Sequence, residues 1–305
     1  MERKMNKKLL NIARIFLGVF ILFLLFWRVG VDKIYDAFSR ADLIFVLLSV
    51  FAFLLVVFIS SVNVYILLSR IKKINFVKFL RFYLLGWVTG QVSPGKIGEF
   101  SLAYYMKNEN VQSGKIVAVV LLDKLISLIF VGGTALVGFL FFFREKFAFE
   151  AILLFFGIVF GVIVFFFSNT GRTFIKKYIL RKYSIHFKGF SKALNFFLLK
   201  QKKFLFYDFL LTALRMFFVV TMFSLLFIAF GTRVDFLTVF LNVCMIGVIT
   251  SLPITTGGLG VRESAATFLF GLSGVEASVV LSAYLCNIVI NYLFAFLSFF
   301  FTKNV

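Results

Sequence analysis

Long apolar stretches recur along this chain, and several of them exceed 18 residues. A helix of about 20 apolar residues is long enough to cross a hydrocarbon core of about 30 Å. Of the 305 residues, 62% are hydrophobic and 48 are Phe. The sequence therefore predicts an all-α polytopic membrane protein that forms a single integral membrane domain, whose helices pack against each other and against lipid.

The net charge of +20 comes mainly from short basic segments beside the apolar stretches. A basic protein can bind nucleic acid, but this placement is typical of the excess of Lys and Arg in cytoplasmic loops. We therefore predict a protein of the cell membrane with both termini in the cytoplasm, in contact with anionic lipid and not with nucleic acid.

Metal and disulfide chemistry has little support in this sequence. The two cysteines, Cys244 and Cys286, lie far apart in apolar segments, and the only histidine is His186. Structural zinc sites need closely spaced Cys and His ligands. We expect no disulfide, no metal and no cofactor.

The charge pattern orients six predicted spans, at about residues 12–29, 43–68, 116–143, 149–167, 204–230 and 275–301. The first is interpreted as uncleaved, because no small-residue cleavage site follows it. Residues 172–203 hold ten Lys or Arg and no acid, which predicts an amphipathic cytoplasmic helix on an anionic leaflet. A topology of eight full spans remains the alternative.

Two Pro/Gly breaks interrupt other apolar regions, at residues 94–99 and 253–263. Irregular backbone at membrane depth is tolerated only where protein or a water-filled cavity covers it. We predict two re-entrant hairpins, with arms at about 76–92 and 99–106 for the first break, and at about 236–252 and 264–272 for the second.

The order of elements is the same in the two halves, at about residues 1–146 and 147–305. Each half reads as span, span, break, span, and the halves start on opposite sides of the membrane. An offset of 164 residues aligns Glu99 with Glu263 and Asp123 with Asn287. This order predicts an inverted-topology repeat, an architecture in which paired breaks mark a transporter's binding site.

Each break combines flexible backbone with charge. Ser93 and Pro94 predict a helix start, whose free N–H groups suit a phosphate or carboxylate. Lys96 and Arg262 add cations, and an acid at membrane depth, such as Glu99 or Glu263, is functional by default. The structural alternative is that the Gly and Pro residues only turn a hairpin and that the acids form ion pairs.

Asp123, Lys124 and Arg215 are further charges inside predicted spans, and we expect Asp123 and Arg215 to face one cavity. The candidate substrate-binding residues share a place in or beside the two breaks or a charge within a span. They are Ser93, Pro94, Gly95, Lys96, Gly98, Glu99, Asp123, Lys124, Arg215, Pro253, Gly257, Gly258, Gly260, Arg262 and Glu263.

No catalytic motif stands out. The chain has neither a Gly-x-Ser-x-Gly nor a Gly-x4-Gly-Lys-Ser/Thr sequence, and its one histidine does not suggest a triad. An intramembrane transferase that uses an acid as its base stays open as an alternative.

The breaks resemble the transmembrane region of the lysylphosphatidylglycerol synthase/flippase family. The matching segments are Pro94-Gly95-Lys96-Ile97-Gly98-Glu99, Asp123-Lys124, and Leu252-Pro253 with Gly257-Gly258-Leu259-Gly260-Val261-Arg262-Glu263. Asp123 stands where the family commonly has Glu. The resemblance covers nearly the whole chain and implies that a lipid with a charged headgroup moves between leaflets.

The resemblance leaves the lipid open between an aminoacyl phospholipid, another phospholipid and a polyprenyl-phosphate carrier. Because we find no soluble aminoacyl-transferase domain, we expect no aminoacylation by this chain. The alternative is a non-transporting membrane partner of a glycosyltransferase or a lipid-modifying enzyme. Either protein could work as a homodimer.

The carboxylates of the two breaks give the first test. If Glu99 and Glu263 hold an amine or carry a proton, the Glu99→Gln, Glu263→Gln double variant should fold normally and lose lipid movement in liposomes. Undiminished movement in the double variant would exclude this pair as part of the site.

Overall fold

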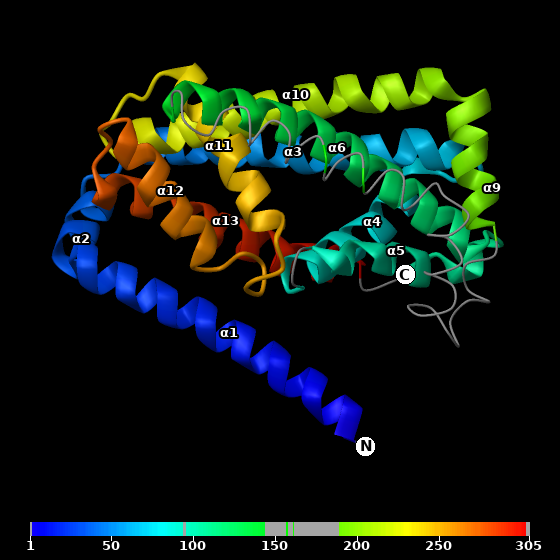
Figure 1. Ribbon diagram of the computed structural model, residues 1–305, viewed down its shortest axis with the longest axis horizontal. Coiled ribbons are helices and arrows are strands. Elements are labelled where there is room, and N and C mark those ends of the chain that lie inside the picture. Colours follow the sequence, from blue (N-terminus) through cyan, green and yellow to red (C-terminus); the bar gives the residue numbers. More distant parts are fainter. Residues whose placement is uncertain (1, 94–95, 144–156, 158–160, 162–188, 303–305) are drawn as a thin grey trace.

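The computed structural model describes residues 2–93, 96–143 and 189–302, together with Gly157 and Gly161 (Figure 1). The described residues form helices and no strand. The predicted span at 149–167 and the first part of the basic segment at 172–203 lie outside these ranges, as do Pro94 and Gly95.

Five long helices form at predicted spans. They are α1 (Glu2–Val29), α3 (Leu43–Ser69), α6 (Ser113–Phe142), α10 (Lys202–Ala229) and α13 (Ala277–Thr302). The last four are long and apolar enough to cross a membrane. The remaining helix, α1, meets the short helix α2 (Val31–Ser39) at a bend of 83°, and this bent pair is a possible fifth span. The prediction of helices at these places is confirmed, although the connection that contains α2 had been expected to be a loop.

The two halves pack on each other mainly through α3 and α10, which lie side by side along the long axis (Figure 1). Both are apolar on nearly all faces, so a buried polar contact sets their register. The side-chain amide of Asn63 in α3 donates a hydrogen bond of 3.0 Å to the hydroxyl of Thr212 in α10, and both residues are fully buried. Such a pair inside an apolar bundle favours one alignment over its neighbours, because any shift would leave two buried polar groups unpaired.

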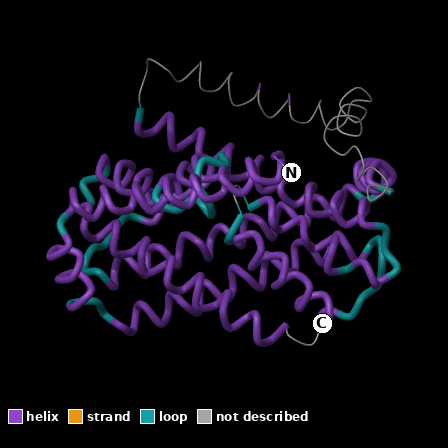
Figure 2. Tube along the Cα trace, turned by 90° about the horizontal axis from the view of Figure 1, so that it is seen from below, coloured by secondary structure: helices purple, strands orange, loops and turns teal. Residues whose placement is uncertain are grey.

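Two helices stop midway along the bundle, and the chain turns back after each of them. Helix α4 (Phe76–Gln91) is followed by the 3₁₀ helix η1 (Ile97–Ser101), α5 (Leu102–Tyr105) and the 3₁₀ turn η2 (Lys107–Glu109). Helix α11 (Phe236–Ser251) is followed by α12 (Val261–Leu272). α4 and α11 enter from opposite ends of the long axis (Figure 1), and Figure 2 shows loop segments midway along the bundle as well as at its ends. The helices lie where the sequence predicts the four arms.

The starts of α4 and α11 follow the same local rule. The carboxamide oxygen of Asn75 accepts a hydrogen bond of 2.9 Å from the N–H of Val77. The carboxylate of Asp235 accepts one of 3.1 Å from the N–H of Thr238. Asn and Asp are favoured at this position because their side chains satisfy N–H groups that the first helical turn leaves free.

The described end of the basic segment does not simply lie on a surface. It forms α9 (Phe190–Asn195) and the π-helix η5 (Phe196–Lys200), and α9 packs against α6. The side chains of Leu194 and Phe197 are fully buried. The apolar face that we assigned to the lipid surface is, in this part, covered by protein, because α6 supplies an apolar surface that excludes water equally well.

The first break depends on glycine at position 98. A Cβ atom there would collide with the carbonyl group of Thr89 in α4. Gly133 in the middle of α6 has no atom within 4 Å of its Cβ position. The two glycines therefore make a matched pair.

We expect Gly98→Ala to lower stability by about 1–3 kcal/mol, the usual cost of overpacking. Gly133→Ala should leave it unchanged or raise it by up to about 1 kcal/mol, because alanine is the better helix former. The apparent melting temperature of each purified variant measures this. Equal melting temperatures for the two would contradict the close packing of η1 on α4.

Candidate functional site

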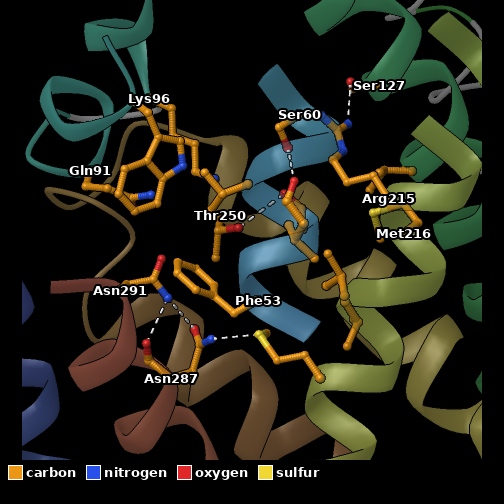
Figure 3. Close-up of a pocket in the computed structure, with 18 of the residues that line it drawn as sticks. Phe53, Ser60, Gln91, Lys96, Ser127, Arg215, Met216, Thr250, Asn287 and Asn291 are labelled. Atoms are coloured by element: carbon orange, nitrogen blue, oxygen red, sulfur yellow. Dashed lines mark hydrogen bonds between the residues drawn. The ribbon is translucent and has the colours of Figure 1, made fainter. Parts of the chain in front are cut away.

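A cavity of about 320 Å³ lies where the two breaks meet the long helices. Its walls come from α3, α4, α6, α10, α11, α12 and α13, and from the first break. Five charged side chains from different elements line it, namely Lys96, Glu99, Lys124, Arg215 and Arg262. Figure 3 shows Lys96 and Arg215 on different sides of the cavity, and Asn287 and Asn291 along a further side.

The tip of the first break holds Lys96 in an unusual backbone conformation. Its φ of 55° lies in the left-handed region, which residues other than glycine seldom occupy. The Ser93 hydroxyl accepts a hydrogen bond of 2.7 Å from the N–H of Gly98, and the Thr89 hydroxyl donates one of 2.9 Å to the Gly98 carbonyl. These bonds fix the tip and present the Lys96 side chain to the cavity.

The helix start predicted at Ser93 and Pro94 is wrong in its position. The described helix after the break begins at Ile97, three residues later than predicted, and its first cap residue is Lys96. Ser93 still satisfies a free N–H of that helix, but from a distance along the chain, because Lys96 turns the backbone between them.

An ion pair joins the first break to the following span. The Glu99 carboxylate contacts the Lys124 ammonium of α6, and the Asp123 carboxylate lies 3.7 Å from the same ammonium group. Burial alone would raise the pKa of the Glu99 carboxyl, but the nearby Lys124 and Lys96 outweigh this effect and hold the pKa below its usual value. Glu99 is therefore a charged group, and it is held by Lys124.

The expected meeting of Asp123 and Arg215 takes a different form. Arg215 lines the cavity and donates a hydrogen bond of 2.7 Å to the Ser127 hydroxyl, one turn after Asp123 on α6. Asp123 itself is only 2% exposed and is absent from the cavity wall. Among the described contacts there is no ion pair between the two side chains.

The second break is closed by its own residues. The Arg262 guanidinium donates a hydrogen bond of 3.1 Å to the Gly257 carbonyl. The Glu263 carboxylate accepts one of 2.6 Å from the N–H of Gly260, which caps α12. Glu263 is 1% exposed, and burial raises the pKa of its carboxyl. The helix start that we expected to offer N–H groups to a ligand is therefore already occupied in part by Glu263.

The two breaks touch at the middle of the molecule. A Cβ atom on Gly257 would lie 2.6 Å from the carbonyl oxygen of Gln91, the last residue of α4. Gly257 and Gly260 both have positive φ, at 64° and 77°, so glycine serves both the conformation and the close approach. On its other side, Gly260 approaches the backbone of Gly18 in α1.

The predicted site residues thus fall into groups. Lys96, Glu99, Lys124, Arg215 and Arg262 line the cavity. Other candidates shape the backbone of the breaks, namely Ser93, Gly98, Gly257, Gly258, Gly260 and Glu263. Pro253 is exposed at the second tip, Asp123 lies behind the wall, and Pro94 and Gly95 lie outside the described residues.

Sequence reasoning missed several polar residues of the site. Gln91, Thr250, Asn287 and Asn291 line the cavity, and Asp208 of α10 is fully buried with both carboxylate oxygens lacking a hydrogen-bond partner. Asp208 could have been found by the rule that pointed to Arg215, since it lies two turns before it in a predicted span. The neutral residues gave no comparable signal, because Asn and Thr also occur inside spans as packing residues.

The geometry agrees with the family comparison. Residues 11–298 match the model of the lysylphosphatidylglycerol synthase transmembrane region. The chain therefore belongs to this family, and family membership together with the four long apolar helices points to a membrane protein with a lipid-related function. Neither a curated protein nor a solved structure matches the chain.

The capping role of Glu263 can be separated from a ligand-binding role. Gln is accepted at the third position of a capping box, so Glu263→Gln should keep most of the stability. Glu263→Ala should lower it by about 1 kcal/mol or more, because an N–H of the buried helix start loses its acceptor. Apparent melting temperatures test this, and an unchanged value for Glu263→Ala would contradict the capping assignment.

Proposed function

We propose that this protein is a flippase-like transporter that moves a lipid with a charged headgroup between the leaflets of the cell membrane. The observation that supports this most directly is the central cavity, where charged side chains from both breaks and from two long helices converge. Charged groups in such a place are costly unless they serve a substrate or ion pathway. The membership of the chain in a family named for a lipid synthase points to the same class of substrate.

We infer that the two breaks are the tips of re-entrant hairpins that enter from opposite faces. In support, α4 and α11 approach the centre from opposite ends of the bundle, and each is followed by a helix that packs back against it (Figure 1). Each of the two helices has 16 residues, or about 24 Å at 1.5 Å per residue. That length is shorter than a hydrocarbon core.

The same elements favour an inverted repeat. The order of α3, α4, first break and α6 recurs as α10, α11, second break and α13. α6 and α13 begin at Ser113 and Ala277, the same offset of 164 residues that relates Glu99 to Glu263. With the charge pattern, this arrangement puts both termini on the cytoplasmic side, and rocking of one half against the other would expose the cavity to each leaflet in turn.

In this proposal the cavity residues bind the headgroup while the acyl or prenyl chains stay in lipid. Lys96 and Arg262 hold its phosphate from the two breaks. Glu99 is held by Lys124, so this pair links the first break to α6 and would rearrange when a charged headgroup enters. Glu263 supports Arg262 from behind by capping α12.

The direct test is movement of labelled lipids across liposomes that contain the purified chain. The variants are Glu99→Gln and Arg262→Gln, and the matched control is Glu109→Gln. Glu109 lies in the same segment as Glu99 but pairs with Lys78 at 2.8 Å, away from the cavity. We expect at least one charged lipid to move, with a loss of about tenfold or more in the two cavity variants, the usual scale for removing a charge-assisted contact.

The control should move lipid at the rate of the wild type. Absence of movement of every charged lipid by folded protein would contradict the transporter, and would favour a membrane protein that acts on a partner enzyme. Equal losses in Glu99→Gln and Glu109→Gln would contradict the cavity as its site.

A further inference from the structure

The charged groups on the cavity wall are unequal in number and in pairing. Four cations line the cavity, and Glu99 is the one acid among its lining residues. Glu99 and Asp123 both face Lys124, so these acids are already engaged with one cation. Within the described part of the chain, Lys96, Arg215 and Arg262 form no ion pair.

Each of the two arginines is oriented by one hydrogen bond to a neutral group. Arg215 uses one terminal nitrogen for the Ser127 hydroxyl at 2.7 Å, and Arg262 uses one for the Gly257 carbonyl at 3.1 Å. A guanidinium has five N–H donors in a fixed plane. Held at one end, each side chain keeps donors for a ligand in the cavity, and it has lost little freedom when that ligand arrives.

The third free cation comes from the strained tip of the first break. Lys96 has the left-handed backbone described above, and residues held in such conformations concentrate at ligand sites. The three cations therefore come from three separate elements, namely the first break, α10 and the start of α12. A ligand that contacts all three must carry negative charge on several oxygens.

From this arrangement we propose that the cavity selects a lipid with a terminal phosphate or diphosphate headgroup, and that it discriminates against a cationic aminoacyl headgroup. The proposal rests on the proposed function and names its substrate class. A phosphomonoester carries about −1.5 to −2 charges at pH 7 and three acceptor oxygens, whereas a phosphodiester carries about half that charge. Three converging cations match the monoester or diphosphate and exceed what one phosphodiester can neutralise.

An aminoacyl headgroup fits this wall poorly. Its ammonium groups would need a free carboxylate, and the lining carboxylate of Glu99 is held by Lys124. Placing an ammonium among Lys96, Arg215 and Arg262 would put like charges together in a partly desolvated site, where Coulomb repulsion is stronger than in water. The two buried acids behind the wall, Asp123 and Asp208, do not line the cavity and so cannot contact the headgroup there.

Equilibrium binding to the full chain in detergent tests the proposal without requiring transport. The probes are a long-chain prenyl phosphate, phosphatidylglycerol, lysyl-phosphatidylglycerol and inorganic diphosphate, each competing with one fluorescent prenyl phosphate. We expect the prenyl phosphate to bind about tenfold more tightly than phosphatidylglycerol, which corresponds to one charge-assisted contact, and lysyl-phosphatidylglycerol to bind most weakly.

The variants Arg215→Gln, Arg262→Gln and Lys96→Gln should each weaken prenyl phosphate binding by about tenfold and weaken phosphatidylglycerol binding less. Arg233→Gln is the matched control, because Arg233 is exposed and lies outside the cavity. The comparison of lipids on the wild-type chain needs no variant, so a variant that fails to fold leaves the test intact.

Lysyl-phosphatidylglycerol binding as tightly as prenyl phosphate would overturn the proposal, and so would equal binding of prenyl phosphate by all four variants. Inorganic diphosphate that displaces the probe as well as the prenyl phosphate does would overturn the lipid as the source of the phosphate. Selective binding without movement across liposomes would support this headgroup class while contradicting the transporter. Movement of lysyl-phosphatidylglycerol in preference to the others would do the reverse.

Discussion

The breaks in two apolar regions can exist only if their backbone N–H and C=O groups find partners away from bulk water. The structure meets this requirement with side chains of the breaks themselves. Ser93 and Thr89 satisfy the two polar groups of Gly98, Glu263 satisfies the N–H of Gly260, and Arg262 donates to the carbonyl of Gly257. Because these bonds hold the tips open as loops, two helices can end in the middle of the molecule and leave space between them.

That space is charged because the same segments that make the turns also carry the ions. Lys96 follows the end of α4, and Arg262 lies in the first turn of α12, so each break delivers one cation to the centre. The close approach of Gly257 to Gln91 brings the two deliveries together. Arg215 and Lys124, from the long helices α10 and α6, complete the wall. Neither break alone would form a site that surrounds a headgroup.

Sequence reasoning found most of the charged wall because a charge in an apolar stretch is a strong signal. Lys96, Glu99, Lys124, Arg215 and Arg262 were all candidates, and all line one cavity. It failed where the signal was pairwise. Glu263 has the same residue type and repeat position as Glu99, yet it caps a helix while Glu99 pairs with Lys124. Partners of this kind depend on which side chains the fold brings within hydrogen-bond distance, and spacing along the chain does not encode that.

The sequence by itself determined the helical class, the places of the long helices and the positions of both breaks, because hydrophobic length and Pro/Gly interruptions act locally. The packing of α9 on α6 and the register of α3 against α10 were decided by the tertiary structure, since each depends on surfaces far apart in the chain. The division of the cations into one paired and three free was also decided there. It follows from distances of a few ångströms between side chains on different helices, which only the packed bundle sets.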